Sequence, residues 1–172
     1  MTIAIYPGRF DPVTAGHLDI VRRGAALFDR VIVSVFEAPE RKTLFNTQER
    51  MEMFAAGVMD LGNVEVKSFR GLVVDWAHKV KATAIVRGIR MNADFENEFE
   101  MALMNRKLAP DVDVVCLMTD IRYQFVRASL IKEVARLGGD ISGLAPENVI
   151  AALKERFNRS EVLRSGEAEA AN

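Results

Sequence analysis

Residues 6–17, with the sequence YPGRFDPVTAGH, form the first pattern in this chain that could do chemistry. An apolar, strand-like run (residues 2–6) leads into this glycine-rich turn, and an amphipathic helical pattern follows it. Helix N-termini present unpaired N–H groups and a partial positive charge, and glycine lets the backbone approach an anion closely. His17 adds a donor that could stabilise charge developing during a reaction. The segment therefore predicts a phosphate site, although residues 14–17 alone would also fit a capped helix with a surface histidine.

A second basic pattern places Arg87 and Arg90 on either side of Gly88, at the end of another strand-like run. Guanidinium groups are planar, permanently charged and well suited to phosphate oxygens. Ordinary salt bridges with the carboxylates of residues 94, 96 or 98 are the alternative. The acidic side chains Asp94, Glu96, Glu98 and Glu100 are interpreted as mostly solvated, and we predict no metal site there.

Three further segments carry weaker signals. Arg41 and Lys42 follow the second strand-like run and fit either a phosphate contact or a solvated loop. Ser129 opens a later helix, so its hydroxyl could cap that helix, contact a phosphate, or do both. Residues 72–76 (LVVDW) fit core packing or a wall for an uncharged part of a substrate.

Elements of alternating type must position these groups. Strand-like runs occupy residues 2–6, 31–36, 64–67, 84–86 and 112–118, with helical patterns between them. This order predicts an α/β fold: a single-domain, doubly wound, five-stranded parallel sheet with C-terminal helices. Ligands of such sheets bind beyond the carboxyl ends of the strands. The loops after the first, second, fourth and fifth strands should therefore meet on one rim.

The helical patterns predict which side chains are buried. The first helix groups Leu18, Val21, Ala25 and Phe28, and the second begins at Asn46 or Thr47 and buries Met51, Phe54, Ala55 and Val58. A helix from Asp94 groups Phe95, Phe99, Ala102 and Leu103. Pro146 begins a last helix that buries Val149, Ile150, Leu153 and Phe157. Shorter helices are expected at residues 73–80 and 129–137. Residues 1–159 form the predicted domain, and residues 160–172 are expected to be a disordered tail.

Composition narrows the class of protein. The chain has 172 residues with 23 Lys and Arg against 24 Asp and Glu, a net charge of −1, which gives no argument for a nucleic-acid or membrane partner. No apolar run approaches the roughly 20 residues of a membrane span, and we expect a cytoplasmic protein. The single cysteine, Cys116, lies in an apolar run and is interpreted as buried.

The motifs that the chain lacks are also informative. It has no Gly-x-x-x-x-Gly-Lys-Ser/Thr loop, no Ser-His-Asp arrangement and no Cys-His metal spacing, which disfavours a kinase or a hydrolase. A histidine at a helix start with basic groups from several loops fits nucleotidyl transfer, where positioning and charge stabilisation dominate. No general base is needed if the nucleophile is a phosphate, because its second pKa is about 6.

These motifs resemble the bacterial phosphopantetheine adenylyltransferase family, one of the nucleotidyltransferases with a Thr/His-x-Gly-His motif. The resemblance spans residues 3–157 and rests on residues 6–17, on RGIR at 87–90 with DFE at 94–96, on SLIKEVA at 129–135, on Asn105-Arg106 and on PENV at 146–149. It implies a Rossmann-like nucleotidyltransferase fold, and transfer of the adenylyl group from ATP to 4′-phosphopantetheine with Mg²⁺ as cofactor. A homohexamer and feedback inhibition by coenzyme A are implied too.

The resemblance also implies roles for individual residues. His17 would stabilise the transition state. The implied ATP-binding residues are Arg9, Phe10, His17, Gly88, Ile89, Arg90, Glu98, Tyr123, Gln124, Phe125, Val126, Arg127, Ala128 and Ser129. The implied substrate-binding residues are Arg9, Arg41, Val73 and Arg87.

The chain departs from the family pattern in three places. Arg9 stands where Ser or Thr is usual, Arg41 where Lys is usual, and Arg127-Ala128 where two serines are usual. We hypothesise that Arg9 and Arg127 add positive charge to the phosphate rim and partly compensate for the lost hydroxyl groups. Two alternatives stay open: a related transferase acting on nicotinate mononucleotide or an alcohol phosphate, and a nucleotide sensor without activity.

Overall fold

The computed structural model of the chain describes the backbone of residues 1–37 and 42–170, and the side chains of residues 1–37 and 42–158. Five strands form one parallel sheet in the order β3-β2-β1-β4-β5. They are β1 (Ile3–Gly8), β2 (Arg30–Phe36), β3 (Val64–Phe69), β4 (Ala84–Ile89) and β5 (Asp113–Met118). Ile5 pairs with Ile32 of β2 and Ile85 of β4. The predicted α/β architecture is confirmed, and the strand order reverses between β1 and β4.

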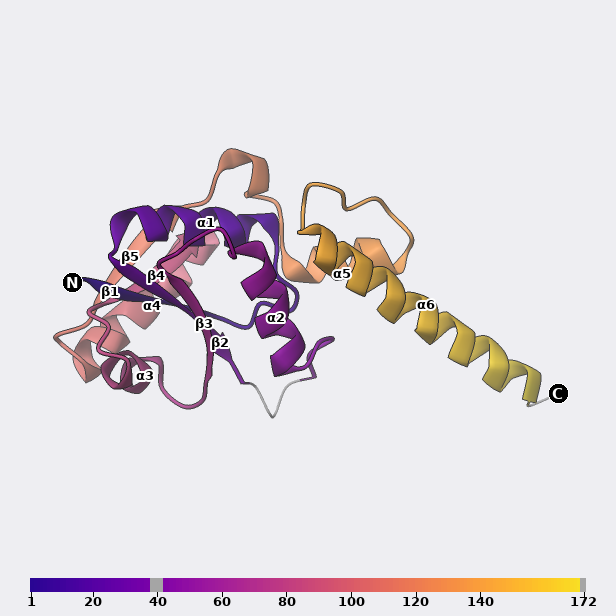
Figure 1. Cartoon of the computed structure of the whole chain (residues 1–172), viewed down its shortest axis with the longest axis horizontal. Coiled ribbons are helices and arrows are strands. Elements are labelled where there is room, and N and C mark those ends of the chain that lie inside the picture. The colour runs from indigo at the N-terminus through magenta and orange to yellow at the C-terminus, as the bar shows by residue number, and fades with distance from the viewer. Residues whose placement is uncertain (38–41, 171–172) are drawn as a thin grey trace.

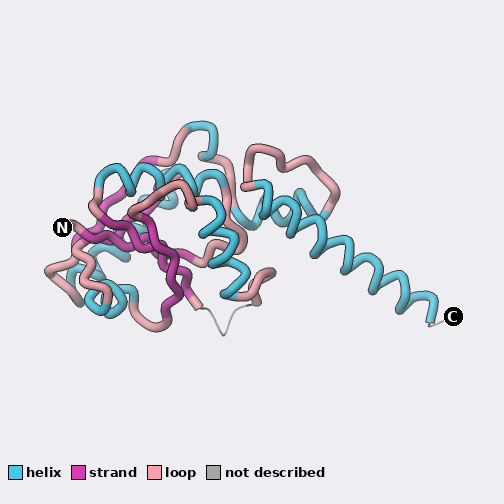
Figure 2. The backbone as a smooth tube through the Cα atoms, viewed as in Figure 1, coloured by secondary structure: helices cyan, strands magenta, loops and turns pink. Residues whose placement is uncertain are grey.

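The helices alternate with the strands and cover both faces of the sheet (Figures 1 and 2). They are α1 (Ala15–Leu27), α2 (Thr47–Gly57), α3 (Val73–Lys79), α4 (Asn92–Leu108), α5 (Ala128–Arg136) and α6 (Glu147–Ala170), with a 3-10 helix at Ile121–Tyr123. In the part of the chain that the structure describes, no helix is long and apolar enough to cross a membrane.

Buried residues alternate along each strand between two apolar clusters, one on each face. On β1, Ala4 and Tyr6 belong to the cluster that includes side chains of α1, α2, α5 and α6. Ile3 and Ile5 belong to the other cluster, which includes α3 and the connection from α4 to β5. This period of two follows from strand geometry, and burial on both faces explains why the strands read as continuous apolar runs.

Helix α2 begins as predicted but buries a different stripe. Asn46 is its N-cap, and Asn46 and Glu49 form a reciprocal capping box. Phe54 and Val58 are buried as expected, whereas Ala55 is exposed and Arg50 and Met53 are buried. The inward-facing residues are 50, 53, 54 and 58, which share one face of a helix. Because Arg50 is charged, the sequence pattern did not predict that it is buried on this face.

The apolar residues that the sequence pattern groups on α4 do not face inward. Phe95, Phe99 and Leu103 are about half exposed, at 48%, 54% and 59%. Cys116, expected to be buried, is exposed as well because it lies on the edge strand β5. The sequence pattern identified an apolar face correctly but not whether this chain itself covers it.

The C-terminal segment also differs from expectation. Disorder was predicted from Ser160, whereas α6 continues to Ala170, and its distal part projects away from the sheet (Figure 1). Val149, Ile150 and Leu153, near the start of α6, are buried as predicted. Residues 160–170 contain few large apolar residues, which argues against their packing on the domain. They are rich in residues of high helix propensity such as Ala, Glu, Leu and Arg, so the segment can be helical without packing.

Candidate active site

A cavity of about 570 Å³ opens at the carboxyl ends of β1 and β4, where the strand order reverses. Open α/β sheets bind ligands at this position. Its walls come from the turn after β1, the loop before α2, the end of β4 with α4, and the start of α5. Among its lining residues are Arg9, Phe10, Asp11, Thr14, His17, Lys42, Arg87, Gly88, Arg90, Asp94, Glu98, Thr119, Val126, Arg127, Ala128, Ser129 and Lys132.

Most of the residues selected from the sequence line this cavity, with some exceptions. Ile89, Tyr123, Gln124, Phe125 and Val73 are not among its lining residues. Ile89 is buried, at 4% exposure, because it points into the core from β4. Arg41 lies outside the described residues. Asp11 and Lys132 line the cavity but were not selected.

His17 is held by the start of its own helix. The Thr14 hydroxyl accepts a hydrogen bond from His17 N–H at 3.3 Å, and His17 Nδ1 accepts one from Thr14 N–H at 3.1 Å. Because Nδ1 is an acceptor, the proton of a neutral imidazole resides on Nε2. No described residue accepts a hydrogen bond from Nε2, so this N–H is free for a ligand. The structure shows the capped helix, and the capping role of Nδ1 leaves Nε2 of the same residue available to a ligand.

The surroundings keep His17 neutral. Burial and, secondarily, the positive charge of Arg90 lower the pKa of His17 to about 4. The Phe10 ring packs edge-on against the imidazole, with 5.0 Å between ring centroids. Gly8 makes room for that ring, since a Cβ at Gly8 would lie 2.6 Å from it. At neutral pH His17 can therefore donate a hydrogen bond but lacks the proton of a general acid.

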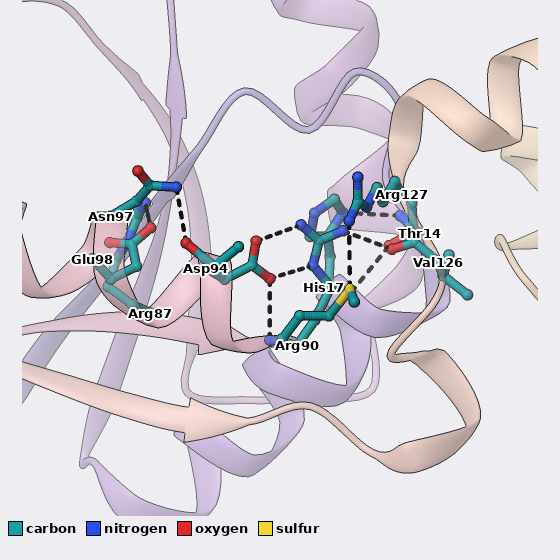
Figure 3. Close-up of polar contacts among 11 residues, drawn as sticks. Thr14, His17, Arg87, Arg90, Asp94, Asn97, Glu98, Val126 and Arg127 are labelled. Carbon is teal, nitrogen blue, oxygen red and sulfur yellow. Dashed lines mark hydrogen bonds and ion pairs between the residues drawn. The ribbon is translucent and has the colours of Figure 1, made fainter.

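The two arginines of the RGIR motif both form ion pairs, as Figure 3 shows. Arg87 binds both carboxylate oxygens of Glu98 and donates to Pro7 O at 3.0 Å. Arg90 binds both oxygens of Asp94, at 3.0 and 3.1 Å, and donates to Val126 O at 3.0 Å. Both arginines thus form the salt bridges of the alternative interpretation, and these bridges hold their guanidinium groups at the cavity wall.

A third ion pair joins distant segments. Asp11 accepts hydrogen bonds from Leu44 N–H and Phe45 N–H, both at 3.0 Å, and from Lys132 Nζ at 2.8 Å. Burial alone would raise the pKa of Asp11, but these hydrogen bonds outweigh it and the pKa is lowered. Asp11 therefore ties the turn after β1 to the loop before α2 and to α5. No local pattern signals this pair, because its partners lie 121 residues apart.

Charge in the cavity is unbalanced in favour of cations. Arg9, Lys42, Arg87, Arg90, Arg127 and Lys132 line it, against Asp11, Asp94 and Glu98. Each of the three carboxylates pairs with one cation. Six cations against three carboxylates leave a formal excess of three positive charges, which suits a polyphosphate.

The start of α5 adds backbone N–H groups that have no acceptor among the described residues. The helix begins at Ala128, one residue earlier than predicted, and its N-cap Arg127 makes no side-chain capping bond. Ser129 is therefore inside the first turn and is not the cap. A helix N-terminus with free N–H groups beside the cavity favours an anionic ligand.

Comparisons with known proteins bear on this arrangement. Residues 5–134 match the family model of cytidylyltransferase-like proteins. The phosphopantetheine adenylyltransferase of Caldanaerobacter subterraneus is 50% identical over 160 residues, covering 93% of this chain and all of the relative. Those of Dehalococcoides mccartyi and Desulfosudis oleivorans are 51% identical, covering 90% and 91% of this chain and 98% and 94% of their own lengths. The chain belongs to the phosphopantetheine adenylyltransferase family.

A solved structure supports the fold independently of close sequence similarity. A candidate nicotinate-nucleotide adenylyltransferase from Vibrio parahaemolyticus superposes with a TM-score of 0.66 at 19% identity, covering 89% of this chain and 99% of the other. At that identity the likeness concerns the fold alone. The resemblance inferred from the motifs is thus confirmed at the level of family and fold.

Proposed function

We propose that this chain transfers the adenylyl group of ATP to 4′-phosphopantetheine, forming dephospho-coenzyme A and pyrophosphate. A phosphate oxygen of phosphopantetheine attacks the α-phosphorus of ATP, and the bond from that phosphorus to the bridging oxygen of the β-phosphate breaks. The observation that carries this proposal is a neutral His17 with a free Nε2–H beside six cavity-lining cations. About 50% identity to phosphopantetheine adenylyltransferases supports the choice of acceptor.

His17 acts as an oriented donor. Its Nε2–H is proposed to bind a non-bridging oxygen of the α-phosphate, where negative charge increases in the transition state. Thr14 fixes the ring and its tautomer from the other side. The attacking phosphate is already largely ionised near neutral pH, so no side chain has to remove a proton.

The cations are proposed to divide between the two substrates. Arg90, which donates to Val126 O just before α5, would hold the phosphates of ATP together with Arg127 and the first turn of α5. Arg87 would hold the phosphate of phosphopantetheine, with Arg9 between the two substrates. Glu98 contacts Arg87, so its effect on ligands would be exerted through that guanidinium.

Mg²⁺ is proposed to arrive with the nucleotide. No group of three His, Cys, Asp or Glu side chains among the described residues could hold a metal ion. The three cavity carboxylates are already paired with cations. Mg²⁺ commonly binds through phosphate oxygens and waters, which fits a MgATP substrate.

Assembly, regulation and location extend the proposal. The exposed apolar face of α4 supports a homo-oligomer, and we propose the hexamer implied by the family. Coenzyme A contains the whole product skeleton, so it should compete for both subsites as a feedback inhibitor. We also propose a cytoplasmic location.

The test is an acceptor-specific assay of pyrophosphate release. ATP or CTP is supplied with phosphopantetheine, nicotinate mononucleotide or an alcohol phosphate, and His17→Ala serves as the inactive control. We expect release only from ATP with phosphopantetheine. Release with CTP or with another acceptor would overturn the choice of substrate, and binding of ATP and phosphopantetheine without turnover would favour a sensor.

A further inference from the structure

Arg50 of α2 is a buried cation outside the cavity lining. It is 1% exposed and is the largest side chain that is fully buried in the described part of the chain. Its guanidinium donates to Arg9 O at 2.5 Å, Phe36 O at 3.0 Å and the Thr47 hydroxyl at 3.0 Å, while Nε donates to Asn46 O at 3.3 Å. Arg50 therefore joins the backbone just beyond β1 to the last residue of β2.

These acceptors are all neutral. No carboxylate in the described residues accepts a hydrogen bond from Arg50, and Asp11 and Glu37 act on it only through space. Burying a cation without a carboxylate partner is expensive, and an apolar side chain would fill the space without that penalty. Unlike an apolar side chain, the Arg50 guanidinium donates hydrogen bonds to backbone carbonyl oxygens and so fixes their positions.

The carbonyl of Arg9 determines where the next N–H points. The Arg9–Phe10 peptide is trans, so the Phe10 N–H lies opposite the Arg9 carbonyl. That carbonyl faces Arg50, which does not line the cavity, whereas Arg9 and Phe10 both do. The Phe10 N–H therefore points away from Arg50, and no described residue accepts a hydrogen bond from it.

The conformation of Phe10 needs support of this kind. Its φ of +49° lies in the left-handed region, which a bulky residue seldom adopts. Its ring is buried against Phe54 of α2, with 4.7 Å between centroids. Turns that combine such a conformation with free N–H groups form concave anion sites. Helix α2 thus supports both the ring and the peptide plane of this residue.

We propose that Arg50 is a positioning residue that orients the Arg9–Phe10 peptide, so that the Phe10 N–H binds a phosphate oxygen of the nucleotide. The inference rests on the proposed nucleotide site but not on the identity of the acceptor. Arg50 touches no substrate and acts only through the backbone of the turn.

The first test is Arg50→Lys, which keeps the charge but not the planar fork. We expect affinity for ATP to fall about tenfold and kcat by about tenfold to a hundredfold, since one oriented donor contributes 10²–10³-fold and here it is misdirected, not removed. Affinity for adenosine, which lacks phosphates, should stay within twofold. The matched control is Arg22→Lys, an arginine of α1 that binds Gly57 O and Asp60 and is absent from the cavity lining.

The second test observes the Phe10 amide directly by NMR with ¹⁵N-labelled phenylalanine. In the unmodified protein ATP should shift this signal strongly, whereas adenosine should not. In Arg50→Lys the response to ATP should be lost. An unchanged Phe10 signal on ATP binding to the unmodified protein would overturn the inference even if the variant does not fold.

Two other outcomes would also overturn it: unaltered ATP affinity and kcat in Arg50→Lys, or equal losses for ATP and adenosine. Failure of the proposed function would look different. The unmodified protein would then release no pyrophosphate from ATP and phosphopantetheine, while the response of the Phe10 amide to ATP could still be measured.

Discussion

The two ring nitrogens of His17 have different roles. Nδ1 completes the capping box of α1, and Nε2 is left for a ligand. Because the hydrogen bond from Thr14 N–H to Nδ1 fixes the imidazole ring, the Nε2–H is held in one orientation, as an oriented donor requires. The sequence predicts this residue because Thr, Gly and His follow a strand at fixed spacing.

Replacing His17 by Ala should lower kcat by about 10²–10³-fold, because one oriented donor to the transition state is lost. ATP affinity should stay within a few-fold, since the arginine wall remains. Steady-state kinetics and calorimetry measure the two effects. His78→Ala is the control, because His78 is exposed and pairs with Asp111. A loss confined to ATP affinity would contradict the role.

The lowered pKa of His17 predicts a pH-dependent stability. Between its ordinary pKa of 6.5 and the value of about 4 in the folded protein, the unfolded state binds more protons at this site. The contribution of His17 is therefore complete above pH 6.5 and declines as the pH falls toward 4. Urea unfolding at pH 7.5 and 5 should show a smaller decline in His17→Gln than in the unmodified protein. Equal declines would show that His17 titrates normally.

Arg9 and Arg127 are exposed cations at the cavity, at positions where the resemblance implies hydroxyl side chains. Changing either to Ser should raise the KM for ATP about threefold to fivefold, because an exposed ionic contact contributes up to about 1 kcal/mol. The salt dependence of KM should weaken in parallel. Arg136→Ser, at the far end of α5, is the control. Unchanged kinetics and affinity in Arg9→Ser would refute the hypothesis of charge compensation.

At the scale of elements, the strands and helix starts were the most predictable features. The capping pair Asn46 and Glu49 located α2, and continuous apolar runs located the strands to within about three residues. The roles of Arg50 and of the Asp11–Lys132 pair were not predictable, because they depend on contacts between segments distant in sequence. Local sequence patterns predict a helix or strand and its apolar face. The residues that meet across the cavity are determined instead by how the sheet arranges these elements.

The capping box of α2 gives a prediction at this scale. Asn46→Ala should reduce the free energy of unfolding by about 1 kcal/mol, because the Glu49 N–H loses its acceptor. Urea unfolding measures the change. Gln48→Ala, which removes only an exposed contact to Glu52, should change stability by less than about half as much. Equal effects would show that the cap contributes nothing specific.

At the scale of the whole molecule, α4 stands out because many of its large apolar side chains are exposed. Phe95, Phe99, Met101, Leu103, Met104 and Leu108 are each about half exposed. Large apolar side chains left exposed in such number on one helix indicate an interaction site. The sequence revealed the apolar residues but not their exposure, because the spacing of apolar residues along a helix does not say which of its faces packs against the sheet.

Phe99→Glu should therefore dissociate the proposed homo-oligomer, because it introduces a charge into an apolar contact. Sedimentation velocity or light scattering would show the smaller species. Met59→Glu, at a residue 85% exposed just after α2, should leave assembly unchanged. A monomeric unmodified protein, or an unaffected Phe99→Glu oligomer, would show that α4 does not form the interface.

The central claim concerns one group transfer and is tested most directly by following the α-phosphorus of ATP. The protein is incubated with ATP labelled at that atom and with 4′-phosphopantetheine, and the products are separated. The label should appear in dephospho-coenzyme A, with unlabelled pyrophosphate in equal amount, and His17→Ala should slow this transfer by orders of magnitude. Label that stays in ATP, or that leaves as AMP without joining phosphopantetheine, would contradict the account.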